Sequence, residues 1–557
     1  MQDSHRVIRR TGWVVWVLAA LCVVIGAPGC GEPAREREDR EPMTTALPED
    51  VGDPVDGDWL LTRLPAEMDH LNPYTISDAY ASGINSLIFD GLLDRNNETL
   101  EMEPNLAEAW EISEDKLEYT FYLREELIFS DGEPLTAHDV KFSFDTMMNP
   151  EHDTAFMRNY YKDVTDCEVI DERTVRFTCS IPYFRHLVML GAFEIIPEHI
   201  YGEGDFNNHP NNRRPIGSGP YVFERWDTGQ QVVLARNERY WGEKPHILKR
   251  VYKIISDENA AFQVLSRGNL DNMNLSAEQW VNRANTARFE AQFNKFAFYA
   301  PSYSYIGWNS RRPQFSDRRV RRALTMLLDR EEIAEHIYYG LAIPVTGNFF
   351  IDSPEYNQDI TPVPFDPAQA IELLEEAGWK DTTGDGVRDK DGVAFRFELL
   401  IVSASVQAEQ IATVFQEQLR RAGIVMTIRP LEWATFTQSI DGRNFDACML
   451  GWSMPPDPDP YQVWHSSQAE AGSNYVGFNN PEADQLIEKA RETFDRDERI
   501  VMYHRFHEIL HEEQPYTFLF CRKNLLAVDR RFHGIVMYPF GPDSKEWWVP
   551  EALQRYP

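Results

Sequence analysis

The sequence predicts a mixed α/β protein with more than one domain. Segments with strand-like alternation of apolar residues follow segments with helical spacing along most of the chain, and no repeat of 20 to 50 residues interrupts that order. The 557 residues correspond to two to four domains at about 100 to 200 residues per domain. Hydrophobic residues make up 43% and charged residues 26% of the chain, as in globular proteins with a buried core.

The charge of the chain excludes one class of partner. Lysine and arginine number 55 against 89 aspartates and glutamates, which gives a formal net charge of -34. A surface of that sign repels phosphate backbones, so no nucleic-acid partner is expected. Six cysteines in a chain of this length also exclude a disulfide-dense scaffold.

Residues 1–29 have the composition of a secretory signal peptide. Arg9 and Arg10 precede an apolar run at 13–25, and small residues follow that run up to Cys30. The run covers about 20 Å of helix, whereas a retained anchor must span about 30 Å of hydrocarbon. A cysteine after small residues resembles the lipobox of bacterial lipoproteins, which implies that Cys30 carries a diacylglycerol.

The segment that follows predicts a tether. Residues 30–58 are rich in proline and charge and have no apolar periodicity, which is typical of a disordered segment. A flexible coil of this length spans about 30 Å. We therefore expect a lipidated, disordered tether between the membrane and the folded body.

Several elements of the body are predicted by local patterns. Apolar residues within 80–93 have the spacing of one helix face, and residues 119–123 alternate as in a strand. Thr136 followed by Asp139 is a capping box that begins a helix.

The cysteines of the body suggest one possible disulfide. Cys167 and Cys179 flank two strand-like runs around a polar turn at 171–174, so the two thiols are candidates to face each other and bridge. Cys448 and Cys521 lie in apolar runs that are typical of buried free thiols.

Sequence blocks shared along most of the chain identify a family resemblance. The blocks are 104–150, 216–221, 236–241, 309–324, 329–331, 451–452 and 457–459. In this order they resemble the extracellular solute-binding proteins of the oligopeptide, dipeptide and nickel class, which deliver ligands to ABC importers. The resemblance extends from about Leu60 to Trp548.

The resemblance implies a two-lobed periplasmic-binding-protein clamshell of type II, in the large peptide-binding class. Lobe I is expected at 59–300 with an inserted subdomain at about 95–210, lobe II at 301–513, and a C-terminal segment at 514–557 that returns to lobe I. Such a protein closes around an oligopeptide as a monomer and presents it to the permease subunits. We expect it in the periplasm or on the cell surface, anchored by lipid to a bacterial membrane.

The resemblance also implies ligand-binding residues. The family's ligand-pairing strand corresponds to residues 449–453, in which Gly451 permits a close backbone approach and Ser453 supplies a main-chain pair. Trp452 beside it and Trp433, which matches a pocket position of the family, are expected to form flat apolar walls. Core packing is the alternative role for either tryptophan.

The residue that would bind the ligand's amino group differs from the family pattern. Pro455 stands where relatives have an aspartate, and the next carboxylate is Asp457. We assign Asp457 to the ligand α-ammonium, with a turn cap as the alternative. Met449 replaces an arginine of some relatives, which argues against a short ligand held at both ends. These two departures leave an oligosaccharide as an alternative ligand.

Two further motifs suggest metal chemistry. His507, Glu508 and His511 form an H-E-x-x-H pattern, so a secreted zinc metallopeptidase is an alternative function, although Pro515 stops the helix soon afterwards. Residues 381–389 match much of a calcium loop, but Gly392 replaces its bidentate glutamate and an acidic turn is favoured. We therefore predict no enzyme, no catalytic residue, no metal site and no resident cofactor.

Overall fold

The computed structural model describes residues 52–76, 78–403 and 405–556. The predicted signal peptide, Cys30 and most of the predicted tether lie outside these residues. Within them, no helix has both the length and the apolar character needed to cross a membrane.

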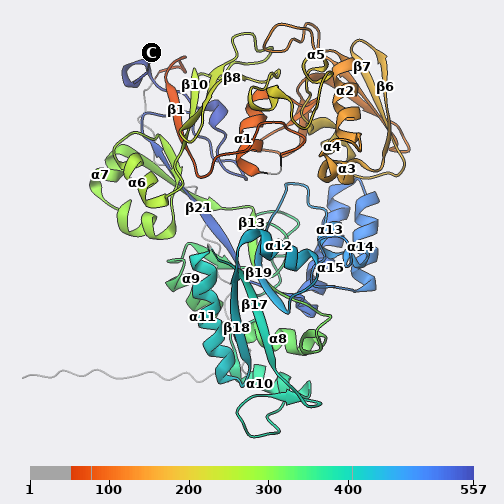
Figure 1. Ribbon diagram of the computed structural model, residues 1–557, viewed down its shortest axis with the longest axis vertical. Helices are drawn as coiled ribbons and strands as arrows, with labels where there is room; N and C mark the ends of the chain where they lie inside the picture. Colours follow the sequence, from red (N-terminus) through yellow and green to blue (C-terminus); the bar gives the residue numbers. More distant parts are fainter. Residues whose placement is uncertain (1–51, 77, 404, 557) are drawn as a thin grey trace, which may run out of the picture. The chain divides into compact units, whose positions relative to one another are not determined.

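The largest sheet combines segments from both ends of the chain (Figure 1). Strand β1 pairs in parallel with β10 and β11, and the other pairs are antiparallel. Its strands, in spatial order, are β12 (Phe293–Tyr299), β21 (Phe520–Asp529), β11 (Asn272–Asn274), β1 (Trp59–Leu64), β10 (Lys249–Ile254), β9 (Gln231–Arg236) and β8 (Tyr221–Asp227), with β14 (Ala342–Pro344) also on β21. The pairing of β21 with β11 and β12 brings the C-terminal part of the chain beside much earlier segments.

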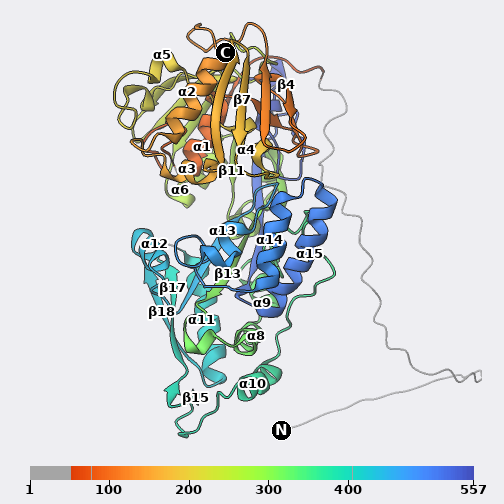
Figure 2. The same cartoon turned by 90° about the vertical axis from the view of Figure 1, so that its right-hand side faces the viewer.

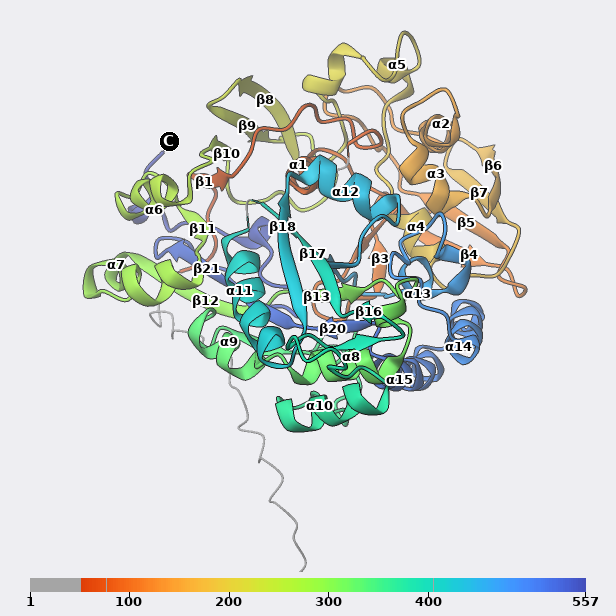
Figure 3. The ribbon, with the colours of Figure 1, turned by 60° about the horizontal axis from the view of Figure 1, so that its bottom comes forward.

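A five-stranded sheet lies in the second half of the chain. Its order is β18 (Val425–Leu431), β17 (Arg396–Val402), β19 (Ala447–Ser453), β13 (Ser302–Trp308) and β20 (Tyr516–Phe518). Apolar residues pack on both of its faces, so its strands read as nearly continuous apolar runs. Figure 3 shows α11 (Val406–Arg421) against β17 and β18. Figure 2 shows α14 (Pro481–Glu492) and α15 (Arg496–Glu513) side by side.

A four-stranded antiparallel sheet has the order β4 (Ala107–Ile112), β5 (Glu118–Leu123), β7 (Thr174–Cys179) and β6 (Val164–Asp171). The alternation predicted for β5 is confirmed, because Tyr119, Phe121 and Leu123 are buried and the residues between them are not. Two short hairpins complete the strands, β2 (Leu93–Arg95) with β3 (Met102–Pro104) and β15 (Asp389–Lys390) with β16 (Val393–Ala394).

Helices connect these sheets. Those before residue 300 are α1 (Ala79–Ile88), α2 (Ala137–Met148), α3 (Ala155–Tyr161), α4 (His186–Ala192), α5 (Glu198–Tyr201), α6 (Glu258–Ser266) and α7 (Ala287–Gln292). Those after it are α8 (Arg318–Met326), α9 (Arg330–His336), α10 (Pro367–Glu376), α11, α12 (Trp433–Asp441), α13 (Tyr461–Trp464), α14 (Pro481–Glu492) and α15 (Arg496–Glu513).

Two helix predictions have different outcomes. The capping box of α2 is confirmed, since Thr136 and Asp139 satisfy each other's backbone N–H groups. The helix predicted over 80–93 ends earlier, at Ile88, because Phe89 adopts an extended backbone and Leu93 already begins β2.

The disulfide considered for the four-stranded sheet is not formed. Cys167 and Cys179 are both free and buried. The register explains this, because Cys167 lies opposite Phe177 and Cys179 lies opposite Val164. The two strands do flank the polar turn as predicted, but the thiols are offset along them.

Glycines in the 216–221 block allow a close approach to α1. The Gly219 N–H donates to the Ile88 carbonyl at 2.8 Å. A Cβ on Gly219 would lie 2.7 Å from the Leu87 carbonyl oxygen and from the Ile88 carbonyl carbon. Both neighbours are backbone atoms, so they cannot rotate away.

We expect Gly219→Ala to lower the free energy of unfolding by about 2 kcal/mol, because the new methyl group forces backbone atoms apart. Gly83→Ala in α1 is the matched control, since nothing lies within 4 Å of its added Cβ. That change should be neutral or stabilise by up to about 1 kcal/mol. Urea unfolding of both variants measures the difference, and equal stabilities would contradict the close approach.

Candidate functional site

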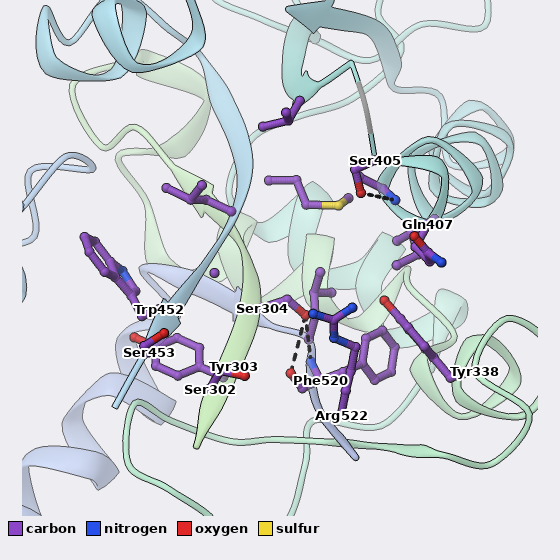
Figure 4. A pocket seen from close by; sticks show the side chains of 17 residues that line it. Ser302, Tyr303, Ser304, Tyr338, Ser405, Gln407, Trp452, Ser453, Phe520 and Arg522 are labelled. Atoms are coloured by element: carbon purple, nitrogen blue, oxygen red, sulfur yellow. Dashed lines mark hydrogen bonds between the residues drawn. The ribbon is translucent and has the colours of Figure 1, made fainter. Parts of the chain in front are cut away.

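A cavity of about 380 Å³ opens beside the five-stranded sheet (Figure 4). Strand β19 and the start of β13 form one side, and the end of β17 with the first turns of α11 forms another. The beginning of β21 contributes Phe520 and Arg522. The cavity therefore lies where several strand ends meet a helix N-terminus.

The cavity exists because β17 and β19 separate. Strand β19 pairs with β13 along all seven of its residues. It pairs with β17 only at Ala447 and Cys448. Beyond that point, residues 449–453 have no strand partner on this side in the part of the chain that the structure describes.

Successive residues of β19 direct their backbone N–H and C=O groups alternately toward β13 and toward the open edge. Met454, just after β19, donates its N–H to the Pro301 carbonyl at 2.8 Å. The Ser304 carbonyl accepts the Leu519 N–H, so the backbone of Ser304 is directed toward β20 and not toward β19. In an antiparallel pair, hydrogen-bonded and non-hydrogen-bonded positions alternate. It follows that Leu450 and Trp452 are directed toward β13, whereas Gly451 and Ser453 direct their N–H and C=O groups to the open edge.

The structure brings three of the predicted site residues together. Gly451, Trp452 and Ser453 all line the cavity. Trp452 stacks on Tyr475 with ring centroids 6.1 Å apart and planes 7° apart, which fixes the indole as a wall. Gly451 is needed here for close packing as well, since a Cβ would lie 3.0 Å from the Tyr303 carbonyl oxygen.

Trp433 is placed elsewhere. It begins α12, is 57% exposed and stacks on Phe436 at 6.0 Å. It does not line this cavity. Its predicted role as a pocket wall stays a prediction.

Asp457 is also outside the cavity lining and already has a partner. Its carboxylate is 2.8 Å from the Arg95 guanidinium, contributed by β2. Its neighbour Asp459 accepts a hydrogen bond from Tyr183 at 2.6 Å and pairs with Arg491 at 3.1 Å. The assignment of Asp457 to a ligand ammonium stays a prediction. The ion pair with Arg95 weighs against it, because this guanidinium already occupies the carboxylate.

Polar residues that the sequence did not point to also line the cavity. Arg522 and the Tyr338 hydroxyl lie on the same side of it in Figure 4. Ser405 caps α11 by accepting the Ala408 N–H at 3.2 Å. Only Ser405 had a sequence signal, because a serine between an apolar run and an amphipathic run is typical of a helix N-cap.

The H-E-x-x-H motif belongs to the core of α15. His507 is fully buried, and its Nδ1 accepts the Asn357 backbone N–H at 3.2 Å. Its Nε2 therefore carries the proton and contacts the Thr346 hydroxyl at 2.9 Å. Both ring nitrogens are used, which leaves no lone pair for zinc, and the peptidase alternative gains no support.

The loop at 381–389 uses its carboxylates internally. Asp381 accepts the N–H groups of Gly384 and Gly386, and Asp389 accepts from Thr382. No group of three or more potential metal ligands occurs in the described residues. This geometry matches the acidic turn that the sequence favoured.

Burial of His507 predicts a pH dependence of stability. Burial, together with the charges of His511 and His504, lowers the pKa of His507 to about 3. The unfolded state, with an ordinary pKa near 6.5, therefore binds more protons between these values, and stability falls as the pH falls through that window. The titration of His507 alone should lower the free energy of unfolding by about 2 kcal/mol at pH 5 relative to pH 8.

We expect His507→Gln to lose this share of the pH dependence. Urea unfolding of wild type and variant at pH 8 and pH 5 measures it, and the comparison cancels the titration of the other groups. Equal pH slopes for both proteins would show that His507 is not the buried neutral imidazole described above.

Comparisons with known proteins identify the family of the chain. The family model for bacterial extracellular solute-binding proteins, family 5 (middle region), matches residues 101–474. The oligopeptide-binding protein AppA of Bacillus subtilis is 31% identical over 522 residues, covering 90% of this chain and 93% of AppA. The nickel-binding periplasmic protein of Escherichia coli is 26% identical and covers 82% and 88% of the two chains.

Solved structures give the same result. The structure of Bacillus subtilis AppA in complex with a nonapeptide has a TM-score of 0.77 at 31% identity and covers 89% of this chain and 100% of AppA. Campylobacter jejuni NikZ in complex with Ni(L-His) has a TM-score of 0.75 at 27% identity, with coverage of 89% and 100%. The predicted fold class, a two-lobed type II periplasmic-binding-protein fold of the peptide and nickel class, is confirmed. This chain belongs to the bacterial extracellular solute-binding proteins of family 5.

Proposed function

We propose that the protein is the ligand-binding subunit of an ABC importer and that its ligand is an oligopeptide in an extended conformation. The observation that carries the proposal is the open edge of β19 inside a cavity. Backbone groups at Gly451 and Ser453 are the partners that an added strand needs. The AppA structure, whose ligand is a nonapeptide, supports the same ligand class.

Main-chain pairing gives affinity that does not depend on ligand sequence. The N–H and C=O groups of a peptide are the same whatever its side chains, so a receptor that pairs with them accepts many sequences. Trp452 offers an apolar wall for one side chain, and Arg522 offers a guanidinium for a ligand carboxylate. A sugar has no repeating donor and acceptor pairs to match this edge, so the oligosaccharide alternative has weaker support.

Transport would follow from hinge closure. A ligand that contacts both lobes stabilises the closed state by its higher affinity for that state, and the closed form is presented to the permease. We propose that lobe I comprises residues 59–300 with its insert at about 95–210, that lobe II comprises 301–513, and that the segment 514–557 returns to lobe I. No bond is made or broken in this cycle.

The family's description as extracellular supports a location outside the cytoplasmic membrane, and we propose the periplasm or the cell surface. We propose further that residues 1–29 are removed as a signal peptide and that Cys30 is lipidated. Residues 30–58 then act as the tether of a monomeric receptor. Mass spectrometry of the mature protein from its host tests this, since a diacylglycerol on Cys30 adds a defined mass.

The ligand class is tested by native mass spectrometry of protein purified from its host. Co-purified masses that fragment as peptides are the expected result. A homogeneous sugar or metal complex in their place would contradict the proposal.

We expect Ser453→Pro to weaken peptide binding at least about 5-fold, because proline removes the outward N–H at the end of the edge and one hydrogen bond contributes about 1 kcal/mol. Ser453→Ala is the matched control, since it keeps the backbone donor and should bind like wild type. Isothermal titration with a mixed-sequence nonapeptide library measures both. Equal affinities for the two variants would exclude pairing at this position.

A further inference from the structure

Asp457 lies among arginines that come from distant parts of the chain. Arg95 at the end of β2 places Nη2 2.8 Å from Asp457 Oδ2, and its Nη1 donates to the Leu100 carbonyl. The side chains of Arg95 and Asp457 are only 21% and 20% exposed. The ion pair is therefore mostly shielded from water, and the Leu100 carbonyl holds the Arg95 guanidinium in place.

Two more guanidinium groups lie near this carboxylate. Arg185 and Arg499 both lie within electrostatic range of Asp457. Arg499 is buried and donates to the carbonyl groups of Thr493 and Phe494. Neither arginine forms an ion pair with a carboxylate in the described residues.

Asp459, the second carboxylate near these arginines, does not cancel their excess positive charge. Asp459 is paired with Arg491 at 3.1 Å and accepts from Tyr183 at 2.6 Å. Arg95 and Arg491 form ion pairs with the two carboxylates, and Arg185 and Arg499 lie within electrostatic range of Asp457. Glu355, which also lies within range of Arg499, is neutralised by its own ion pair with Arg496 at 2.9 Å. In a chain with a net charge of -34, this is a local excess of positive charge.

We propose that Arg95 occupies the carboxylate of Asp457 in place of a ligand α-ammonium, so that this receptor binds oligopeptides without using a free amino terminus. This inference rests on the proposed function. A ligand ammonium would have to break the charge-assisted hydrogen bond of Arg95 and approach three further cations. Peptides with a blocked amino terminus, and long peptides whose terminus lies elsewhere, bind as well as peptides with a free one.

The inference differs from the role that the sequence predicted for Asp457. An aspartate beside the ligand strand is an anchor for an ammonium only if its carboxylate is available. The sequence shows Asp457 but not Arg95, which reaches it from β2. Recognition then depends on the backbone of β19 and not on the ligand's end.

Competition between two forms of one peptide library tests the inference. A mixed-sequence nonapeptide library is made with free and with isotopically labelled N-acetylated amino termini, and the bound ratio is read by native mass spectrometry. Wild type should bind both forms equally within about 3-fold. Arg95→Gln exposes Asp457 and should favour the free form at least about 3-fold over wild type. Adding Asp457→Asn to that variant should restore the wild-type ratio.

Matched variants separate charge from folding. Arg173→Gln removes another guanidinium, paired with Glu125 at 3.2 Å and 49% exposed, and should leave the ratio unchanged. Asp457→Asn alone should also leave it unchanged, which gives a second readout if Arg95→Gln does not fold. A wild-type preference for the free form that Asp457→Asn abolishes would overturn the inference, as would an unchanged ratio in Arg95→Gln. Failure of either form to bind any variant would instead overturn the proposed function.

Discussion

The open edge of β19 is the constraint on which the account depends. Backbone N–H and C=O groups inside a protein need hydrogen-bond partners, and proteins cover exposed strand edges in most sheets. Here β17 leaves β19 after Cys448, so the groups of Gly451 and Ser453 face a cavity. In the proposed function a peptide backbone would supply their missing partners, and the free energy of those hydrogen bonds would become binding energy.

The rest of the five-stranded sheet holds that edge in place. Strand β13 lies between β19 and β20 and is therefore fixed on both sides. Trp308 is fully buried and donates to the Thr517 hydroxyl at 3.1 Å, which ties β13 to β20. The buried Arg330 donates to the Phe518 carbonyl at 2.7 Å and anchors α9 to the same strand. Because the edge is already rigid, ligand binding there costs little conformational entropy.

Local patterns predicted local structure, and shared blocks predicted the fold. The capping box at Thr136 needed only neighbouring residues, whereas the strand around Trp452 was expected from the family resemblance. Contacts between distant segments were not predictable in this way. The offset of Cys167 depends on strand register, the burial of His507 depends on what packs over α15, and the partner of Asp457 comes from another sheet. Each is set by three-dimensional packing that no spacing in the sequence records.

Amide hydrogen exchange resolved to single residues along β19 tests the central claim most directly. The alternation of the strand predicts that the amides of Leu450 and Trp452 exchange slowly with or without ligand, because they already pair with β13. Those of Gly451 and Ser453 should exchange fast in the free protein and slow markedly when a nonapeptide is added. Peptide binding that leaves the exchange of Gly451 and Ser453 unchanged would show that this edge is not where the ligand lies.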